Sequence, residues 1–284
     1  MKHEILIRVE ARLALADCNN SGMENTAIQI KIVCIGAGRL AHHLMPALQH
    51  AGCNIIQVCN RTQWPAVLLA QKLHAVSHIT RIEELDKTAD VYFLTVSDDA
   101  VLEVAAQLES MHDLEGLIVH CSGVLGLNVL PHERKGIFYP LQTFSEHHET
   151  EWHHTPIIIT ANQPEDMEIL ASLAGKISNS TYQMSDEQKT VIHLAAVFAN
   201  NFTNHMMTLA EAICAQHEVS FDILKPLIRT TFQKALLLGP SGSQTGPAVR
   251  GDEITIEKHL KLLQDYPDLA EVYRIVTKSI VNQR

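Results

Sequence analysis

The chain has 284 residues, of which 46% are hydrophobic, and its formal net charge is -10 at pH 7. This length allows one large domain or two modest ones, and the acidic balance argues against a general binder of nucleic acids or acidic membranes. No run approaches the ~18 apolar residues that a transmembrane helix needs. The six cysteines form no C-x-x-C pair, so we expect buried free thiols and a cytoplasmic protein.

Residues 1–27 precede the first convincing strand, and they lack the charged and then apolar pattern of a signal peptide. A second methionine, Met23, lies just before that strand. Two interpretations of this N-terminal extension stay open: a disordered segment, or a start assigned too far upstream.

Residues 28–183 show short apolar strands that alternate with helical stretches. The strands are β-branched and almost continuously apolar, which is typical of parallel strands covered on both faces. This alternation predicts an α/β fold with a doubly wound sheet, as in a Rossmann domain. The strands are expected at residues 31–36, 54–60, 91–96, 117–123, 136–140 and 155–161, and the helices at 39–52, 64–75, 99–111 and 163–177.

Residues 184–284 carry no strand pattern, and we expect them to form an all-α C-terminal domain. A long helix is predicted over residues 185–217, with Ser185 as N-cap and Gln188 three residues later completing a capping box. Further helices are expected at residues 221–239, 254–266 and 267–283.

The segment after the first strand has the pattern G-x-G-x-x-A, with Gly36, Gly38 and Ala41 in the three positions. The first glycine allows a tight turn, the second lets the backbone approach a pyrophosphate, and the alanine permits close helix packing. The helix N-terminus adds amide donors and the positive end of its dipole. We therefore predict that Gly36, Gly38, Arg39, Leu40 and Ala41 bind a dinucleotide. The alternative is a tight turn in a fold that has lost its ligand.

The end of the second strand indicates which dinucleotide binds. An NAD-binding fold usually has Asp or Glu there, about 20 residues after the glycine turn, to bind the ribose hydroxyls. This chain has Asn60, followed by Arg61 and Thr62. A 2′-phosphate would be repelled by an acid but bound by a guanidinium and a hydroxyl. The sequence thus predicts NADP(H) as the cofactor, unless Arg61 is only a solvated residue at a helix start.

Polar side chains also follow the later strands, where ligands of doubly wound sheets bind. Two candidate contacts lie at the end of the strand expected at residues 91–96, and one lies near the end of the strand expected at 117–123. Three more lie at or just after the end of the strand at 136–140, in an apolar setting typical of pocket rims. The predicted cofactor contacts are Val96, Ser97 and Ser122, and the predicted substrate contacts are Tyr139, Gln142 and Thr143. For Ser122, a simple Ser-Gly turn is an equally good interpretation.

The stretch "HLAAVFANNFTNHM", residues 193–206, is helical in pattern but contains no Lys, Arg, Asp or Glu. On a 3.6-residue period, His193, Asn200 and Asn204 lie on one stripe between apolar flanks. A solvent-facing stripe would normally use Lys and Glu, and asparagine disfavours helix interiors. The pattern favours a stripe that faces a cleft over an ordinary amphipathic helix.

Four segments together carry a resemblance to a known group: "GAGRLAHHL", "FYPLQTFS", "HLAAVFANNFTNHM" and "TGPAVRGD". The chain resembles a bacterial group of Rossmann-like NADP oxidoreductases with a helical C-terminal domain of unknown function. This group belongs to a superfamily that includes 6-phosphogluconate dehydrogenase, ketopantoate reductase and pyrroline-5-carboxylate reductase. The resemblance implies a cytoplasmic NADP(H)-dependent oxidoreductase that acts on a small, anionic carbonyl or imine substrate.

The resemblance also points to catalytic residues. β-Hydroxyacid dehydrogenases of this superfamily carry Lys-x-x-Asn-Asn on the long helix, with the lysine as general acid. Here Val197 has the lysine position, while Asn200 and Asn201 remain, which puts hydroxyacid chemistry in doubt. We predict His193 as the group that transfers the proton, with Asn200 and Asn204 orienting the substrate.

The segment "SQTGPAVRGD" resembles the Gly-Pro turn that starts a helix in pyrroline-5-carboxylate reductases. We predict that Thr245 and Arg250 bind the substrate, with Arg250 gripping a carboxylate or phosphate and Asp252 orienting it. A plain ion pair between Arg250 and Asp252 is the alternative. In related enzymes this segment comes from the partner subunit, so we expect a homodimer through the helical domain.

The histidine-rich run "SEHHETEWHH" lacks the spacing that fixes a tetrahedral metal site. We interpret it as a solvated loop and predict no metal. Two other functions stay open: a non-catalytic NADP(H)-binding sensor or assembly subunit, which the missing lysine favours, and a deazaflavin-linked reductase, for which no pocket residues can be named.

Overall fold

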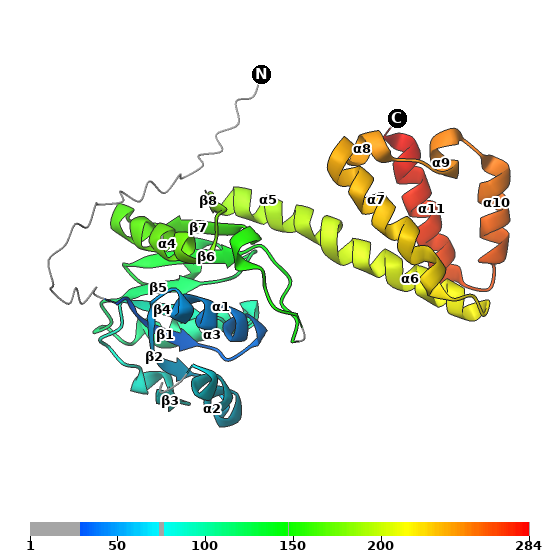
Figure 1. Cartoon of the computed structure of the whole chain (residues 1–284). Helices are drawn as coiled ribbons and strands as arrows, with labels where there is room; N and C mark the ends of the chain where they lie inside the picture. Colours follow the sequence, from blue (N-terminus) through cyan, green and yellow to red (C-terminus); the bar gives the residue numbers. More distant parts are fainter. Residues whose placement is uncertain (1–28, 74–76, 147, 284) are drawn as a thin grey trace, which may run out of the picture. The chain divides into compact units, whose positions relative to one another are not determined.

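The computed structural model describes residues 29–73, 77–146 and 148–283. The predicted N-terminal extension, residues 1–27, lies outside the described residues. Contacts divide the chain into two compact units, with the boundary between Val197 and Phe198. The first unit contains the sheet and the second contains only helices (Figure 1). Among the described helices, none combines the length and apolarity needed to cross a membrane.

An eight-stranded sheet forms the centre of the first unit, and its strand order is β3-β2-β1-β4-β5-β6-β7-β8. All neighbours pair in parallel except β6 and β7. The predicted α/β class with a doubly wound sheet is therefore confirmed. The strands are β1 (Lys31–Ile35), β2 (Asn54–Cys59), β3 (Ser77–Ile79), β4 (Val91–Leu94), β5 (Leu117–His120), β6 (Lys135–Pro140), β7 (Ile157–Ala161) and β8 (Thr181–Gln183).

Helices pack on both faces of this sheet, which explains why the central strands are apolar along their whole length. Successive residues of β1 point to opposite faces: Ile32 belongs to one buried cluster and Val33 to the other. The first cluster includes side chains of α1 (Arg39–His50), α2 (Gln63–Lys72) and α4 (Pro164–Ile177). The second includes α3 (Asp98–Glu109) and the short 3-10 turn η1 (Ile82–Glu84). Two further 3-10 turns are η2 (Leu127–Val129) and η3 (Trp152–His154).

A long helical segment starts at Ser185, where the predicted capping box is present: the hydroxyl of Ser185 accepts from Gln188 N, and the Gln188 side chain accepts from Ser185 N. The segment comprises α5 (Asp186–Ala196), the π-helical turn η4 (Val197–Phe202) and α6 (Thr203–Gln216). The π-turn falls on the asparagine-rich stretch and coincides with the boundary between the two units. The uniform 3.6-residue period of the sequence analysis therefore does not hold across it.

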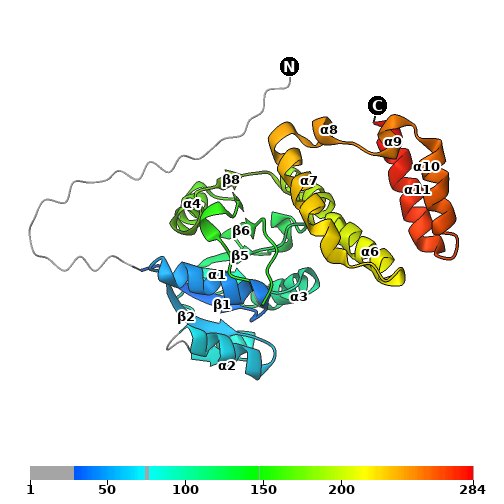
Figure 2. The same cartoon turned by 45° about the vertical axis from the view of Figure 1, so that its right-hand side comes forward.

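The remaining helices belong to the second unit. They are η5 (Phe221–Leu224), α7 (Lys225–Leu238), α8 (Pro240–Ser243), α9 (Pro247–Arg250), α10 (Glu253–Leu262) and α11 (Pro267–Asn282). Figures 1 and 2 both show α10 and α11 side by side. In the described part of this unit, the only buried hydrophobic residues are Ala248, Leu263 and Ala270.

Candidate functional site

The turn between β1 and α1 passes so close to β4 that only glycine fits at its first position. Gly36 has φ 105°, and a Cβ there would lie 2.6 Å from Cγ1 of Val96 and 2.9 Å from the carbonyl carbon of Thr95. The hydroxyl of Thr95 donates to Gly36 O at 2.8 Å and fixes the approach. The helix α1 begins at Arg39, so the backbone N–H groups of its first turn, which have no partner within the helix, lie beside this turn. An anion-binding helix start requires this arrangement.

The side chain of Asn60 links the end of β2 to the glycine turn. Its Oδ1 accepts from Ala37 N at 3.1 Å, and its Nδ2 donates to the carbonyl and the hydroxyl of Thr62 at 2.9 and 3.0 Å. A carboxylate could accept the first bond, but it could not donate the other two. Asn60 therefore does more than remove a negative charge, because it also fixes the backbone that carries Arg61.

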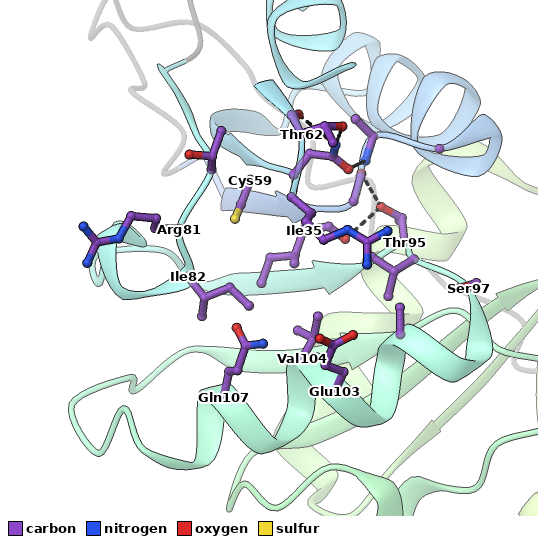
Figure 3. A pocket seen from close by; sticks show the side chains of 18 of the residues that line it. Ile35, Cys59, Thr62, Arg81, Ile82, Thr95, Ser97, Glu103, Val104 and Gln107 are labelled. Atoms are coloured by element: carbon purple, nitrogen blue, oxygen red, sulfur yellow. Dashed lines mark hydrogen bonds between the residues drawn. The ribbon is translucent and has the colours of Figure 1, made fainter. Parts of the chain in front are cut away.

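These residues border one open cavity of about 770 Å³ at the carboxyl ends of the strands. Figure 3 shows that α3 forms the opposite wall, where Val104 and Gln107 face Ile82. Arg81 and Glu103 also line the cavity, and the guanidinium of Arg81 is engaged with Glu83 and Glu84 at 3.6 and 3.7 Å. Arg61 forms no ion pair within the described part of the chain.

Most of the predicted cofactor residues border this cavity, and four do not. Arg39, Leu40 and Ala41 all belong to the first turn of α1, where the side chain of Ala41 is fully buried. Ser122 lies on the loop after β5. The predicted residues that line the cavity are Gly36, Gly38, Asn60, Arg61, Thr62, Val96 and Ser97. A dinucleotide fits this donor set, since the Gly36 turn, the α1 amides and the Arg61 guanidinium all favour phosphate groups.

A second group of polar side chains joins the end of β6 to α5. The hydroxyl of Tyr139 lies 2.9 Å from Nδ1 of His193. Burial raises the pKa of Tyr139, and the negative charge of Asp98 adds to this shift. The phenol therefore keeps its proton, and it can donate to Nδ1 or accept from an Nδ1–H, as the tautomer of the ring requires. The structure shows Tyr139 bonded to His193, and its predicted contact with a substrate stays a prediction.

The other predicted site residues are exposed. Gln142 and Thr143 bond each other on the loop after β6, with Thr143 N donating to Gln142 Oε1 at 2.9 Å. Thr245 borders an apolar cavity of about 300 Å³ between α6 and α11 in the helical unit. The exposed Arg250 lies 3.8 Å from Asp252, which itself caps α10. Asn200 and Asn204 belong to the helical unit, and both side chains are exposed there.

Comparisons with known proteins cover both units. A family model for shikimate / quinate 5-dehydrogenase matches residues 20–119, and the model of a domain of unknown function, DUF2520, matches residues 155–280. No curated protein matches the chain. The crystal structure of a candidate NADP oxidoreductase from Bacteroides fragilis is 38% identical, with a TM-score of 0.81, over 89% of this chain and 98% of that one. This chain belongs to the same family, which joins a Rossmann domain to a DUF2520 domain.

More distant structures share the fold of this DUF2520-family protein. A Thermotoga maritima protein is 21% identical over 87% of this chain and 99% of its own, with a TM-score of 0.68. A reductive aminase from Aspergillus terreus, solved with NADPH and ethyl-5-oxohexanoate, is 13% identical over 90% and 94%, with a TM-score of 0.63. The family resemblance and the NADP(H) cofactor expected from the sequence agree with the comparisons, which support a general NADP oxidoreductase.

Lys189 of this DUF2520-family protein was not predicted as a site residue, although it is fully buried. Its ammonium group donates to three backbone carbonyls of the loop after β5, those of Ser122, Gly123 and Leu125, at 3.3, 3.0 and 2.8 Å. The sequence "SDEQK" is typical of an exposed helix start, so it gives no indication that Lys189 is buried and bonds this loop. The available signal was the position of Lys189, one helical turn before His193.

His120, at the end of β5, is fully buried and holds the same loop. Its Nδ1 accepts from Ser122 N at 3.2 Å, and its Nε2 lies 3.3 Å from Gly126 O. Burial lowers the pKa of His120 to about 4, so the ring is neutral at pH 7. In this form Nδ1 accepts and Nε2–H donates, which satisfies both contacts.

The lowered pKa of His120 predicts a loss of stability in mild acid. Between pH 6.5 and about 4 the unfolded chain binds a proton at this residue and the folded chain does not, so stability falls as pH falls. We expect a contribution of about 2 kcal/mol between pH 7 and pH 5. Urea unfolding at both pH values should show this slope in the native protein and a flatter one in His120→Gln. The exposed His78→Gln variant is the control, and an equal slope in all three proteins would contradict the prediction.

Proposed function

We propose that this protein is an NADP(H)-dependent oxidoreductase that transfers hydride between the nicotinamide and a small, anionic carbonyl or imine compound. The observation that carries the proposal is the Asn60 bridge, which fixes Arg61 and Thr62 beside the cavity of the Gly36 turn. A guanidinium and a hydroxyl at this position suit the 2′-phosphate of NADP(H). The family relationship to the Bacteroides fragilis protein supports the same cofactor.

The Tyr139–His193 pair supports a role in proton transfer. NADPH supplies a hydride when it is bound, and reduction of a carbonyl or imine then needs one proton at the oxygen or nitrogen. With Tyr139 at Nδ1, Nε2 of His193 is the ring nitrogen open to a substrate. The proton would come from Nε2–H of the imidazolium, which leaves a neutral ring whose Nδ1–H donates to the oxygen of Tyr139. In the reverse reaction, Nε2 of the neutral ring would accept the proton.

The helical unit would supply the substrate contacts. Asn200 and Asn204 carry amides that can orient a carbonyl or imine group, and Asn200 lies in the π-turn, a type of irregularity that is frequent at functional sites. Arg250 is exposed and only loosely paired with Asp252, so it is open to a carboxylate or phosphate. These roles follow from side-chain chemistry, and they make the expected substrate anionic.

We also propose that the protein forms a homodimer through its helical unit. This unit leaves many large apolar side chains exposed, among them three successive leucines at the end of α7: Leu236, Leu237 and Leu238 are 88%, 82% and 61% exposed. Such a density of exposed apolar surface is unusual for a monomer and typical of an oligomer interface. A second copy of the chain is the partner that the proposal commits to.

The first test concerns the cofactor. Purified protein is titrated with NADPH and with NADH, and binding is followed by nicotinamide fluorescence and thermal shift. NADPH should bind more tightly than NADH, and Arg61→Glu should weaken NADPH binding about 10- to 100-fold by replacing attraction with repulsion. Lys87→Glu makes the same charge change before β4, remote from the cavity, and should leave affinity unchanged. Unchanged NADPH affinity in Arg61→Glu would refute the assignment of Arg61.

The second test concerns His193. Small 2-keto acids, alone and with ammonia, are screened for NADPH oxidation. With a substrate found, His193→Ala should lower kcat at least about 100-fold because the proton donor is lost. His205→Ala, which removes an exposed histidine of α6, should retain native turnover. Full turnover in His193→Ala would exclude the proposed proton transfer, and NADPH binding with no turnover in a broad screen would favour the sensor function.

The third test concerns assembly. Sedimentation velocity should give the mass of a dimer for the native chain. The variant with both Leu236→Ser and Leu237→Ser should be monomeric, or weaken dimerisation at least about 100-fold, because it removes two large apolar side chains from the interface. Leu68→Ser, at an exposed leucine of α2, is the matched control and should remain dimeric. A native chain that sediments as a monomer would contradict the proposal.

A further inference from the structure

The ammonium group of Lys189 is matched to the loop after β5. An ammonium has three N–H groups and no acceptor, and Nζ of Lys189 meets three acceptors, the carbonyls of Ser122, Gly123 and Leu125. Deprotonation would leave one of these carbonyls without its donor. Although burial lowers the pKa of Lys189, the contacts require the charged form.

Stability alone does not account for a charge at this position. Lys189 forms no ion pair within the described residues, and a buried charge stabilises a fold poorly compared with a well-packed apolar side chain. Its contacts instead go to one short loop. A residue that gains little stability but fixes a loop geometry at a candidate site is consistent with a positioning role.

Other side chains bond three backbone N–H groups of the same loop. The hydroxyl of Ser122 accepts from Val124 N and Leu125 N at 3.1 and 3.0 Å. Oδ2 of Asp186 accepts from Leu127 N at 2.9 Å. Asp186 and Lys189 are three residues apart on α5, so this helix grips the loop at two points. The loop conformation is therefore set by side chains around it and depends little on backbone pairing.

Gly123 is the point where this loop meets the Tyr139–His193 pair. Lys189 holds its carbonyl at 3.0 Å. A Cβ on Gly123 would lie 2.4 Å from Nδ1 of His193 and 2.8 Å from the ring of Tyr139. The backbone of Gly123 thus forms a wall against both rings. Any movement of this loop changes the space in which the His193 ring can turn.

We propose that Lys189 is a positioning residue: by holding the carbonyls of Ser122, Gly123 and Leu125, it keeps the backbone of Gly123 against His193 and so preserves the hydrogen bond between Tyr139 and Nδ1. Without Lys189 the loop relaxes, the imidazole gains alternative orientations, and its two nitrogens exchange the proton. The expected effect on kcat rests on the proposed role of His193, but the positioning of the ring by Lys189 does not.

The test uses the full chain and reads the ring of His193 directly. The ¹⁵N signals of the imidazole are recorded by NMR at neutral pH and assigned with a His193→Gln sample. In the native protein they should show one tautomer, because the hydrogen bond to Tyr139 fixes the state of Nδ1. In Lys189→Met, which keeps an unbranched side chain one atom shorter and removes all three N–H donors, they should move to averaged values of a tautomer mixture. With a substrate in hand, kcat should fall about 10- to 100-fold, with KM and NADPH affinity changed less than about threefold.

A matched control separates this effect from general loss of a lysine. Lys176 also donates to a backbone carbonyl, that of Ala51 at 3.3 Å, but on the surface, so Lys176→Met should leave the His193 signals unchanged. Lys189→Arg, if it retains the loop contacts, should restore the native signals. Folded Lys189→Met with a native His193 spectrum would overturn the proposal.

A second variant covers the case in which Lys189→Met does not fold. Lys189→Gln removes the buried charge but keeps two N–H donors, so it is milder and should give partial averaging of the His193 signals. A native spectrum in folded Lys189→Gln would also overturn the inference. The spectra need neither cofactor nor substrate. Failure of NADPH binding would therefore defeat the proposed function and leave this test of Lys189 intact.

Discussion

The close passage of the β1–α1 turn over the end of β4 is the constraint on which the nucleotide cavity depends. Gly36 has no side chain, so its backbone can lie against Thr95 and Val96, and Thr95 donates to its carbonyl. Asn60 then ties the same turn to the end of β2. Three neighbouring strands are thus joined at their carboxyl ends by one glycine, one hydroxyl and one amide. This junction brings the helix start, the Arg61 segment and the wall of α3 around a single cavity.

Features that are local in the sequence could be predicted. The apolar strands, the glycine turn and the capping box at Ser185 all follow from patterns a few residues long. The strands β3 and β8 were missed, because a three-residue strand such as Ser77–Ile79 is too short to show any periodicity. The π-turn was also missed, since a change of hydrogen-bond register leaves no mark in residue composition.

Contacts between distant residues could not be predicted in this way. Tyr139 and His193 were chosen for separate roles, and only the fold shows that they are hydrogen-bonded. Lys189 has the sequence context of a solvated lysine, yet the loop after β5 buries it. In both cases the decisive partner lies more than fifty residues away in the chain. Sequence patterns identify which residues can do chemistry, but the topology determines which of them meet.

The double role of Asn60 has a consequence for the evolution of cofactor choice. Codons for asparagine and aspartate differ by one base, and the side chains differ by one group, an NH2 in asparagine and a second oxygen in aspartate. The substitution Asn60→Asp would add the carboxylate that NAD-binding folds use, and in the same step it would remove the two bonds to Thr62 that need an N–H donor. A single mutation would therefore introduce a charge that repels a 2′-phosphate and loosen the segment that carries Arg61. A preference for NAD(H) could therefore arise by a single base change, but a variant that binds NAD(H) and NADP(H) equally well is structurally disfavoured.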